Sequence, residues 1–250
     1  MFIRTKGLIL REVRYKEADR ILTVYSESSG KITVTAHGAY SKKNKLAAST
    51  QALTYSDFIL ENRNGRYTVK EASVVESFPG LRKEISKYYL SFYFLEIADA
   101  FTFEEVADND ILRLVLNSLY ALSNSLCPDS QIKAAFELKI CSFTGYEPSI
   151  LYCCECGKEH PDDALFCPES GVVCCRNCYK PSLGTALLIR PEILSAMRYI
   201  VSANLKSFLS FSLPEELLPD LERICEQYFR IHTERKFSTL ELWKSVNNND

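Results

Sequence analysis

The stretch 153–178, CCECGKEHPDDALFCPESGVVCCRNC, divides this chain of 250 residues into a part before it and a part after it. It contains two Cys-x2-Cys pairs, Cys153 with Cys156 and Cys175 with Cys178. Two such pairs about 15 to 20 residues apart have the spacing that places four thiolates around one zinc ion. The two-residue gap lets the chain fold back, so that both sulfurs of a pair face the metal. The sequence therefore predicts one zinc ion, held by these four cysteines.

Two neighbouring cysteines leave the choice of ligands open. Cys154 and Cys174 each stand one residue from a preferred ligand. We prefer the set above because both of its pairs have the two-residue gap. Four cysteine ligands close the coordination sphere, whereas a catalytic zinc keeps one position for water. The zinc is therefore predicted to be structural, and the alternatives are a metal-free loop and a redox switch.

The composition is that of an ordinary soluble globular protein, with 46% hydrophobic and 25% charged residues. No run of eighteen or more apolar residues occurs, so we expect no membrane span. The first residues, MFIRTKG, carry charge and lack the apolar region of a signal peptide. We therefore expect a cytoplasmic chain in a reducing compartment, where clustered cysteines bind metal more often than they form disulfides, and we interpret Cys127, Cys141 and Cys225 as small buried hydrophobes.

Charge is distributed unevenly along the chain. Residues 1–80 contain 13 Lys and Arg against 8 Asp and Glu, a balance of +5, and the remainder contains 17 against 24, a balance of −7. A basic N-terminal module followed by an acidic remainder is compatible with nucleic-acid binding by the first and protein contacts by the second.

Short alternating segments with turn residues between them predict a β-barrel at the N-terminus. The first three form a meander, and Asn64-Gly65 joins the last two as a hairpin. Five strands with one longer connection favour an OB-fold, with an SH3-like barrel as the alternative. The expected strands cover residues 7–13, 20–25, 31–36, 53–61 and 67–76. We assign residues 1–80 to this nucleic-acid-binding domain.

After Pro79-Gly80 the apolar residues recur at helical spacing, which predicts a helical domain over residues 81–250. The zinc-binding segment, residues 150–180, is inserted into it, so the fold class is α+β. An aromatic stripe between Tyr88 and Phe103 is interpreted as helix-bundle core and domain interface, with a peptide-binding groove as the alternative. The expected helices cover residues 85–95, 111–122, 131–144, 191–201 and 214–231.

The connection after the third strand is basic and has the composition for phosphate contacts. Alone, a lysine-rich loop is typical of a solvated surface, but further cations occupy the neighbouring strands and turns. An OB barrel binds single strands through a basic groove and aromatic platforms. The lysines of the connection are Lys42, Lys43 and Lys45, and the other cations are Arg11, Arg14, Lys16, Arg20, Lys31, Arg63 and Arg66. The candidate platforms are Tyr15, Tyr25, Tyr40 and Tyr67.

The chain lacks the common catalytic motifs. It contains neither a Gly-x4-Gly-Lys-Ser/Thr loop nor a Gly-x-Ser-x-Gly elbow, and its three histidines form no His-Glu-x2-His pair. We therefore predict that the protein is not an enzyme.

The chain resembles the RecO family of bacterial recombination mediators. The resemblance rests on RYKEADRIL at 14–22, Gly30-Lys31, AHGA at 36–39 and the Lys42-Lys43-x-Lys45-Leu46 loop. It continues in Cys153-x2-Cys156-Gly157 and in SGVV at 170–173, and so covers nearly the whole chain in order. It implies an N-terminal OB-fold followed by a helical domain with a four-cysteine zinc segment.

The resemblance also implies a function in DNA repair without catalysis. Members bind single- and double-stranded DNA, anneal complementary strands coated by single-strand binding protein, whose C-terminal tail they contact, and work with RecR to load RecA. A cytoplasmic, nucleoid-associated protein is expected. Two other classes stay open, a general single-stranded DNA- or RNA-binding module and a helical scaffold for protein contacts. The implied DNA-binding residues are Arg14, Lys31, Lys42, Lys43, Lys45, Arg63 and Arg66.

Overall fold

A computed structural model of the chain describes residues 1–41, 43–159 and 163–247. Its contacts define two compact units, residues 1–124 with 237–250 and residues 125–236. The predicted boundary at residue 80 falls inside the first unit. There it coincides with the change from strands to helices, and as a limit between independent domains it stays a prediction.

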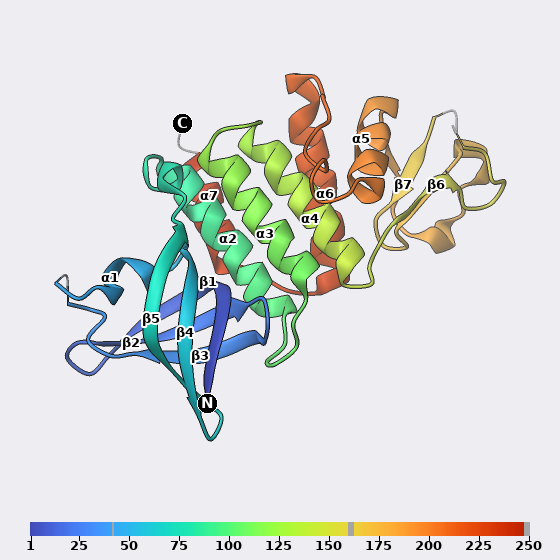
Figure 1. The fold of residues 1–250 in the computed structure, drawn as a ribbon. Helices are drawn as coiled ribbons and strands as arrows, with labels where there is room; N and C mark the ends of the chain where they lie inside the picture. Colours follow the sequence, from blue (N-terminus) through green and yellow to red (C-terminus); the bar gives the residue numbers. More distant parts are fainter. Residues whose placement is uncertain (42, 160–162, 248–250) are drawn as a thin grey trace. The chain divides into compact units, whose positions relative to one another are not determined.

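The N-terminal part of the first unit is a closed five-stranded barrel with strand order β1-β2-β3-β5-β4 (Figure 1). The β3–β5 pair is parallel and the other pairs are antiparallel, which is the arrangement of an OB-fold. The predicted OB-fold is therefore confirmed over the predicted SH3-like alternative. The strands are β1 Phe2–Tyr15, β2 Asp19–Ser26, β3 Gly30–Ala36, β4 Tyr55–Arg63 and β5 Arg66–Glu76.

Alternation along the strands fills the barrel. In β3, Ile32, Val34 and Ala36 are buried while Thr33 is exposed, as expected for a strand with one wet face. β1 is buried at four successive positions, residues 7–10, because one face meets the barrel core and the other meets helix α2, Ile85–Phe101. The register of β1 against β2 shifts between Ile9 and Arg11, which marks a β-bulge at Leu10.

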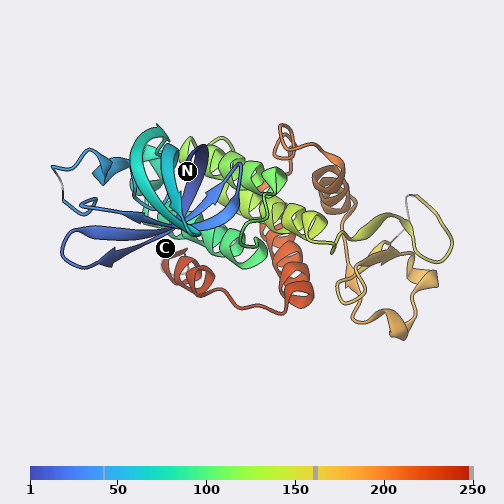
Figure 2. The ribbon, with the colours of Figure 1, turned by 60° about the horizontal axis from the view of Figure 1, so that its bottom comes forward.

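The connection after β3 contains one short helix, α1, Leu46–Ser49. Figures 1 and 2 both show the β1–β2 hairpin and this connection projecting from the same side of the barrel. The Arg20 guanidinium lies beneath α1, where it donates to the Ala47 carbonyl (2.9 Å) and the Thr50 hydroxyl (3.0 Å). A buried arginine thus fixes the connection to β2.

Three helices complete the first unit: α2, α3 (Asn109–Ser123) and α7 (Ser238–Asn247). The Asp108 side chain accepts from the amides of Asp110 and Ile111, so it caps α3 as its position predicts. α7 packs on α2, where Trp243 donates to the Ser86 hydroxyl (3.0 Å). Glu96 of α2 accepts from the amides at the start of α7, Ser238 and Thr239.

The second unit contains helices α4 (Asp129–Phe143), α5 (Pro191–Ser202) and α6 (Leu218–Thr233), with α4 packed against α6. Lys139 of α4 donates to three carbonyls at the end of α5, those of Ile200, Val201 and Ala203. These bonds satisfy groups that a helix C-terminus leaves open. No helix in the described part of the chain has the length and apolar character needed to cross a membrane.

A small four-stranded sheet with order β6-β8-β7-β9 carries the predicted zinc segment. Its strands are only two to five residues long, which is too short for hydrophobic alternation in the sequence to predict them. The four strands are β6 Ser149–Cys153, β7 Leu165–Cys167, β8 Val172–Cys174 and β9 Leu187–Leu188.

Candidate nucleic-acid interface and metal centre

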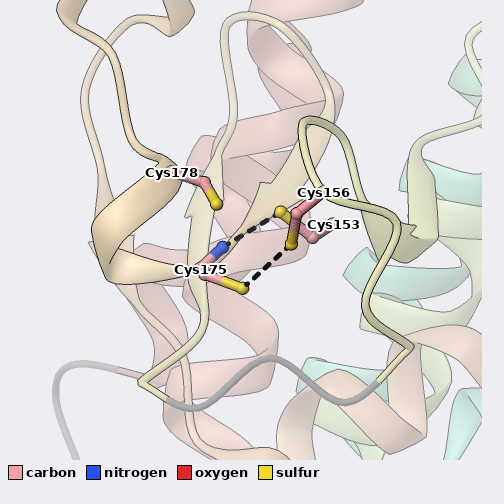
Figure 3. A group of neighbouring side chains, drawn as sticks. All are labelled: Cys153, Cys156, Cys175 and Cys178. Carbon is pink, nitrogen blue, oxygen red and sulfur yellow. Dashed lines mark hydrogen bonds between the residues drawn. The ribbon is translucent and has the colours of Figure 1, made fainter.

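The sulfurs of Cys153, Cys156, Cys175 and Cys178 gather at the end of the small sheet, all within 4.8 Å of one another (Figure 3). Cys156 Sγ and Cys175 Sγ lie 3.7 Å apart. Tetrahedral zinc with Zn–S bonds of about 2.3 Å places its sulfurs about 3.8 Å apart. The donor set therefore fits a closed four-thiolate metal site.

Local backbone geometry brings these sulfurs together. Gly157 follows the first pair at φ +72° and its amide donates to the Cys153 carbonyl (3.0 Å), which closes the first turn. In the second pair the Cys178 amide donates to the Cys175 carbonyl (2.9 Å). The parallel pairing of β6 with β8 then sets the two turns beside each other.

The surroundings of Cys153 favour the thiolate form of its side chain. Burial opposes its ionisation, but hydrogen bonds from the backbone amides of Cys156, Cys175 and Glu155 lower its pKa to about 6. The Cys175 amide lies 3.4 Å from Cys153 Sγ. Amides directed at sulfur favour the charged form, and the thiolate is the species that binds metal.

The neighbouring cysteines lie elsewhere. Cys154 is exposed, and Cys167 and Cys174 are fully buried in the small core of the sheet, where Leu165 and Val172 also pack. Burial raises the pKa of the Cys174 thiol to about 12. The structure thus brings together the four cysteines with the two-residue gaps.

A second group of functional side chains lies where the β1–β2 hairpin meets the connection that follows β3. The Tyr40 amide donates to the Ala18 carbonyl (2.8 Å), and the Arg14 guanidinium lies 4.5 Å from the centre of the Tyr40 ring. We call the surface formed by residues 14–20 and 37–45 the hairpin–loop surface. Its exposed charged side chains among the described residues are Arg14, Lys16, Lys43 and Lys45 against Glu17, so the surface is basic.

Asp19 joins the two segments of this surface. One of its carboxylate oxygens accepts from the Gly38 amide (2.8 Å), and the other lies 3.0 Å from His37 Nδ1. These hydrogen bonds hold the pKa of Asp19 below its usual value. The sequence interpretation missed this pair, because its two members are 18 positions apart and the only signal was the turn-like composition of 37–39.

Two of the four candidate stacking tyrosines are accessible on the hairpin–loop surface. Tyr15 is 44% exposed and Tyr40 is 47% exposed. Tyr25 is fully buried and its hydroxyl donates to the Asp108 carbonyl (2.6 Å), while Tyr67 packs against the barrel core. Of the four candidates, Tyr15 and Tyr40 are therefore the two whose rings a ligand can reach.

The predicted cations differ in their surroundings. Lys43 and Lys45 are exposed in the connection, and Lys42 lies outside the described residues. Arg63 contacts Glu61 (2.7 Å) near the β4–β5 turn, and exposed Arg66 follows that turn. Figure 1 shows this turn at the bottom of the view, away from the connection at the left. The structure thus gathers Arg14, Lys43 and Lys45, and places Arg63 and Arg66 apart from them.

Lys31 forms contacts within the fold. Its ammonium donates to the Asp99 carbonyl (2.6 Å) and to the Asp99 carboxylate (3.0 Å) at the end of α2, and its side chain is 18% exposed. The Cβ of any residue replacing the adjacent Gly30 would lie 2.2 Å from the Val106 carbonyl oxygen, so the 102–106 segment also approaches closely here. β3 is thereby tied to the helical part of its unit.

We predict that Lys31→Met lowers the free energy of unfolding by about 0.5–1.5 kcal/mol, because it removes the donor to the Asp99 carbonyl and carboxylate, and the carboxylate is exposed enough to be hydrated instead. Urea unfolding measures this, and Lys43→Met, at an exposed position, is the control with the same change of charge. Equal stability of the two variants would contradict a structural role for Lys31.

Comparison with known proteins agrees with both parts of the chain. Residues 1–78 match the family described as recombination protein O N terminal, and residues 82–241 match recombination protein O C terminal. The DNA repair protein RecO of Acetivibrio thermocellus is 32% identical over 245 residues, which cover 98% of this chain and 97% of that protein. The RecO proteins of Caldicellulosiruptor bescii and Alkaliphilus metalliredigens are 29% and 27% identical, each over 98% of this chain and 98% and 100% of their own lengths. The chain belongs to the RecO family of DNA repair proteins.

Proposed function

We propose that this protein is a recombination mediator that binds single- and double-stranded DNA and anneals complementary strands coated by single-strand binding protein. We further propose that it contacts the C-terminal tail of that protein and helps RecR load RecA. Family membership supports this function. The observation that carries it is the hairpin–loop surface, where an OB barrel presents Arg14, Lys43 and Lys45 beside two accessible tyrosines.

The proposed mechanism depends on contacts to the phosphate backbone. Lysine and arginine displace counterions from phosphates without reading base edges, so binding is tolerant of sequence and weakens with salt. Annealing requires two strands held close together while their bases stay free to pair. Cationic side chains on a loop and a neighbouring hairpin meet this requirement better than a groove that reads base edges.

We infer in addition that Cys153, Cys156, Cys175 and Cys178 hold one zinc ion with a structural role. The fit of their sulfurs to tetrahedral spacing supports this assignment. When bound, zinc would stabilise four thiolates in one small volume. The metal-binding energy then contributes to the folding of a sheet whose strands are too short to be stable alone.

Replacing Lys42, Lys43 and Lys45 together by alanine is expected to weaken DNA binding and flatten its salt dependence. Each lysine that neutralises a phosphate contributes about 0.7 to the slope of log K against log salt on single strands, so the slope should fall by up to about 2. Fluorescence anisotropy with labelled oligonucleotides at several salt concentrations measures both quantities. The control replaces Lys83, Lys206 and Lys236, which are also exposed. If the salt dependence of the triple alanine variant is unchanged, the loop does not contact DNA.

One assay separates the proposed function from the two alternative classes. It follows annealing of complementary strands that already carry single-strand binding protein. A mediator accelerates the reaction, a general single-stranded DNA- or RNA-binding module competes with the coating protein, and a scaffold has no effect. Either of the last two outcomes contradicts the proposal.

A further inference from the structure

The first unit contains a cleft of about 570 Å³ outside the barrel, in the size range of about 300–1,000 Å³ that is usual for ligand sites. It lies among β1, the residues that precede β4, and helices α2 and α7. The β-bulge at Leu10 belongs to its wall, and Arg11 and Arg82 lie at its margin. The proposed function assigns no role to this cleft.

Two of the three acidic side chains of the cleft are paired with cations. Glu12 pairs with Arg20 (3.2 Å), and Asp99 pairs with Lys31 (3.0 Å). Glu96 keeps its charge and accepts the amides that begin α7. The guanidinium groups of Arg11 and Arg82 therefore outweigh the one uncompensated carboxylate, and Arg82 is held in place by the carbonyls of Ser77 (2.9 Å) and Ala52 (3.4 Å).

The cleft also presents an aromatic face. Tyr88 is 36% exposed and contacts Phe92 edge-on, with ring centroids 4.9 Å apart and an interplanar angle of 63°. Phe92 therefore supports the Tyr88 ring while part of that ring stays exposed. A cleft lined by an exposed ring and two guanidinium groups suits a ligand that combines a flat aromatic system with negative oxygens.

The cleft and the hairpin–loop surface share strand β1. Glu12 of the cleft precedes Arg14 by two residues, so the two side chains lie on the same face of the strand, about 7 Å apart along it. The Tyr40 ring lies near both the Arg14 and the Arg20 guanidinium groups, at 4.5 Å and 5.6 Å. Arg20 in turn pairs with Glu12 in the wall of the cleft. A strand bound at the hairpin could therefore reach the cleft within a few nucleotides.

We propose that the cleft takes one unpaired base of a bound DNA strand, stacked on Tyr88, with its flanking phosphates at Arg11 and Arg82. This inference rests on the proposed function and deepens it. A base already paired in a duplex cannot enter, so the cleft adds affinity for single strands alone. Pairing with a complementary strand withdraws the base, which weakens the hold on the annealed product.

The test compares Tyr88→Ala with Tyr120→Ala, since Tyr120 is exposed on α3 and does not line the cleft. Base stacking on an aromatic ring is typically strong enough that its loss weakens binding about tenfold. Anisotropy titrations should therefore show about a tenfold loss for oligo-dT with Tyr88→Ala, an unchanged affinity for duplex, and no change with Tyr120→Ala. Tyr88→Phe retains the ring and should bind as the wild type does. Equal losses on both DNAs, or no loss on oligo-dT, would overturn the proposal.

Two further measurements use the wild-type protein, so they test the inference even if Tyr88→Ala does not fold. Because binding tolerates any sequence, an oligonucleotide that carries 2-aminopurine at several positions should change its fluorescence on binding the wild-type protein. Unchanged fluorescence at saturation would refute stacking. Calorimetric titration with dTMP tests whether the cleft binds a free nucleotide and not a base within a strand. Binding of dTMP with a micromolar dissociation constant would show that the ligand is the free nucleotide. If Tyr88→Ala instead impairs binding of an acidic peptide while DNA binding is untouched, the base assignment is wrong. Failure of the wild type to bind any DNA would overturn the proposed function itself.

Discussion

Replacing Cys153 by serine will abolish stoichiometric zinc binding and unfold the small sheet that contains residues 149–188. The other three sulfurs cannot close a tetrahedral site alone, and Cys153 is the buried member of the four, packed with Cys167 and Cys174. Structural zinc in peptide-sized sites binds with about 10–16 kcal/mol of apparent free energy, which is also folding free energy. Elemental analysis should fall from about one zinc per chain to none, and limited proteolysis should cut within 149–188.

The matched control for this prediction is Cys154→Ser. Cys154 is the next residue, is exposed, and is the alternative ligand in the sequence pattern. We expect this variant to keep its zinc and its protease resistance. The reverse result, with zinc lost from Cys154→Ser and kept by Cys153→Ser, would show that Cys154 is the ligand and Cys153 is not. A wild-type protein purified without chelator that contains no zinc would refute the metal centre altogether.

Acid should release the zinc. Protons compete with the metal for the four thiolates, and a bound cation keeps them ionised below the pKa of about 6 that Cys153 has without metal. Zinc retention measured by dialysis at graded pH should therefore be complete at about pH 7 and fall only as the pH drops below about 6. Retention that is still complete at about pH 3 would contradict thiolate ligation.

The barrel was predictable because its information is local. Strict alternation in residues 31–36 and the Asn64-Gly65 turn specify strands and a hairpin without reference to distant residues. Where partners are distant, the prediction was incomplete. β1 begins at Phe2 because it pairs with Glu61 of β4, and α7 forms because Leu240 and Trp243 have a surface to be buried against. Neither partner is visible in the local pattern.

The candidate sites divide in the same way. The cysteine spacing anticipated the sulfur cluster, since each pair is held by its own turn. Charge alone could not separate Lys31, which meets Asp99 across 68 positions, from Lys43, which is exposed. The aromatic stripe showed a similar limit: Tyr93 is fully buried as predicted for core, whereas Tyr88 opens onto a cleft.

Lys133→Met will destabilise the second unit strongly. The Lys133 side chain is fully buried between α4 and α6, with its ammonium 3.0 Å from Glu137, 2.8 Å from Glu226 and 3.4 Å from Glu222. Methionine fills nearly the same volume, so the main change is the loss of a charge that faces three carboxylates. Breaking a buried ion pair by removing one partner costs about 3–5 kcal/mol, because the remaining charge is uncompensated. Urea unfolding should show a loss in this range.

The pH dependence of this loss identifies its cause. Burial opposes the charged form of Lys133, but the three glutamates raise its pKa above the usual value. Its stabilising contribution is therefore complete below the unfolded pKa of about 10.4, and is lost only as the pH rises through the still higher folded value. In the wild type, Lys133 adds no pH dependence between about pH 6 and pH 9. In Lys133→Met, acid protonates the uncompensated carboxylates, so the difference between variant and wild type should shrink toward pH 5.

Two companion variants separate charge from packing. Lys206→Met changes the same residue type at an exposed position of the same unit and should leave stability within about 0.5 kcal/mol of the wild type. Lys133→Met combined with Glu137→Leu removes the fully buried carboxylate as well, and should recover part of the loss because fewer charges then stay buried without a counter-ion. If the double variant is less stable than Lys133→Met, the loss arises from packing between α4 and α6, and the ion cluster is not what holds these helices together.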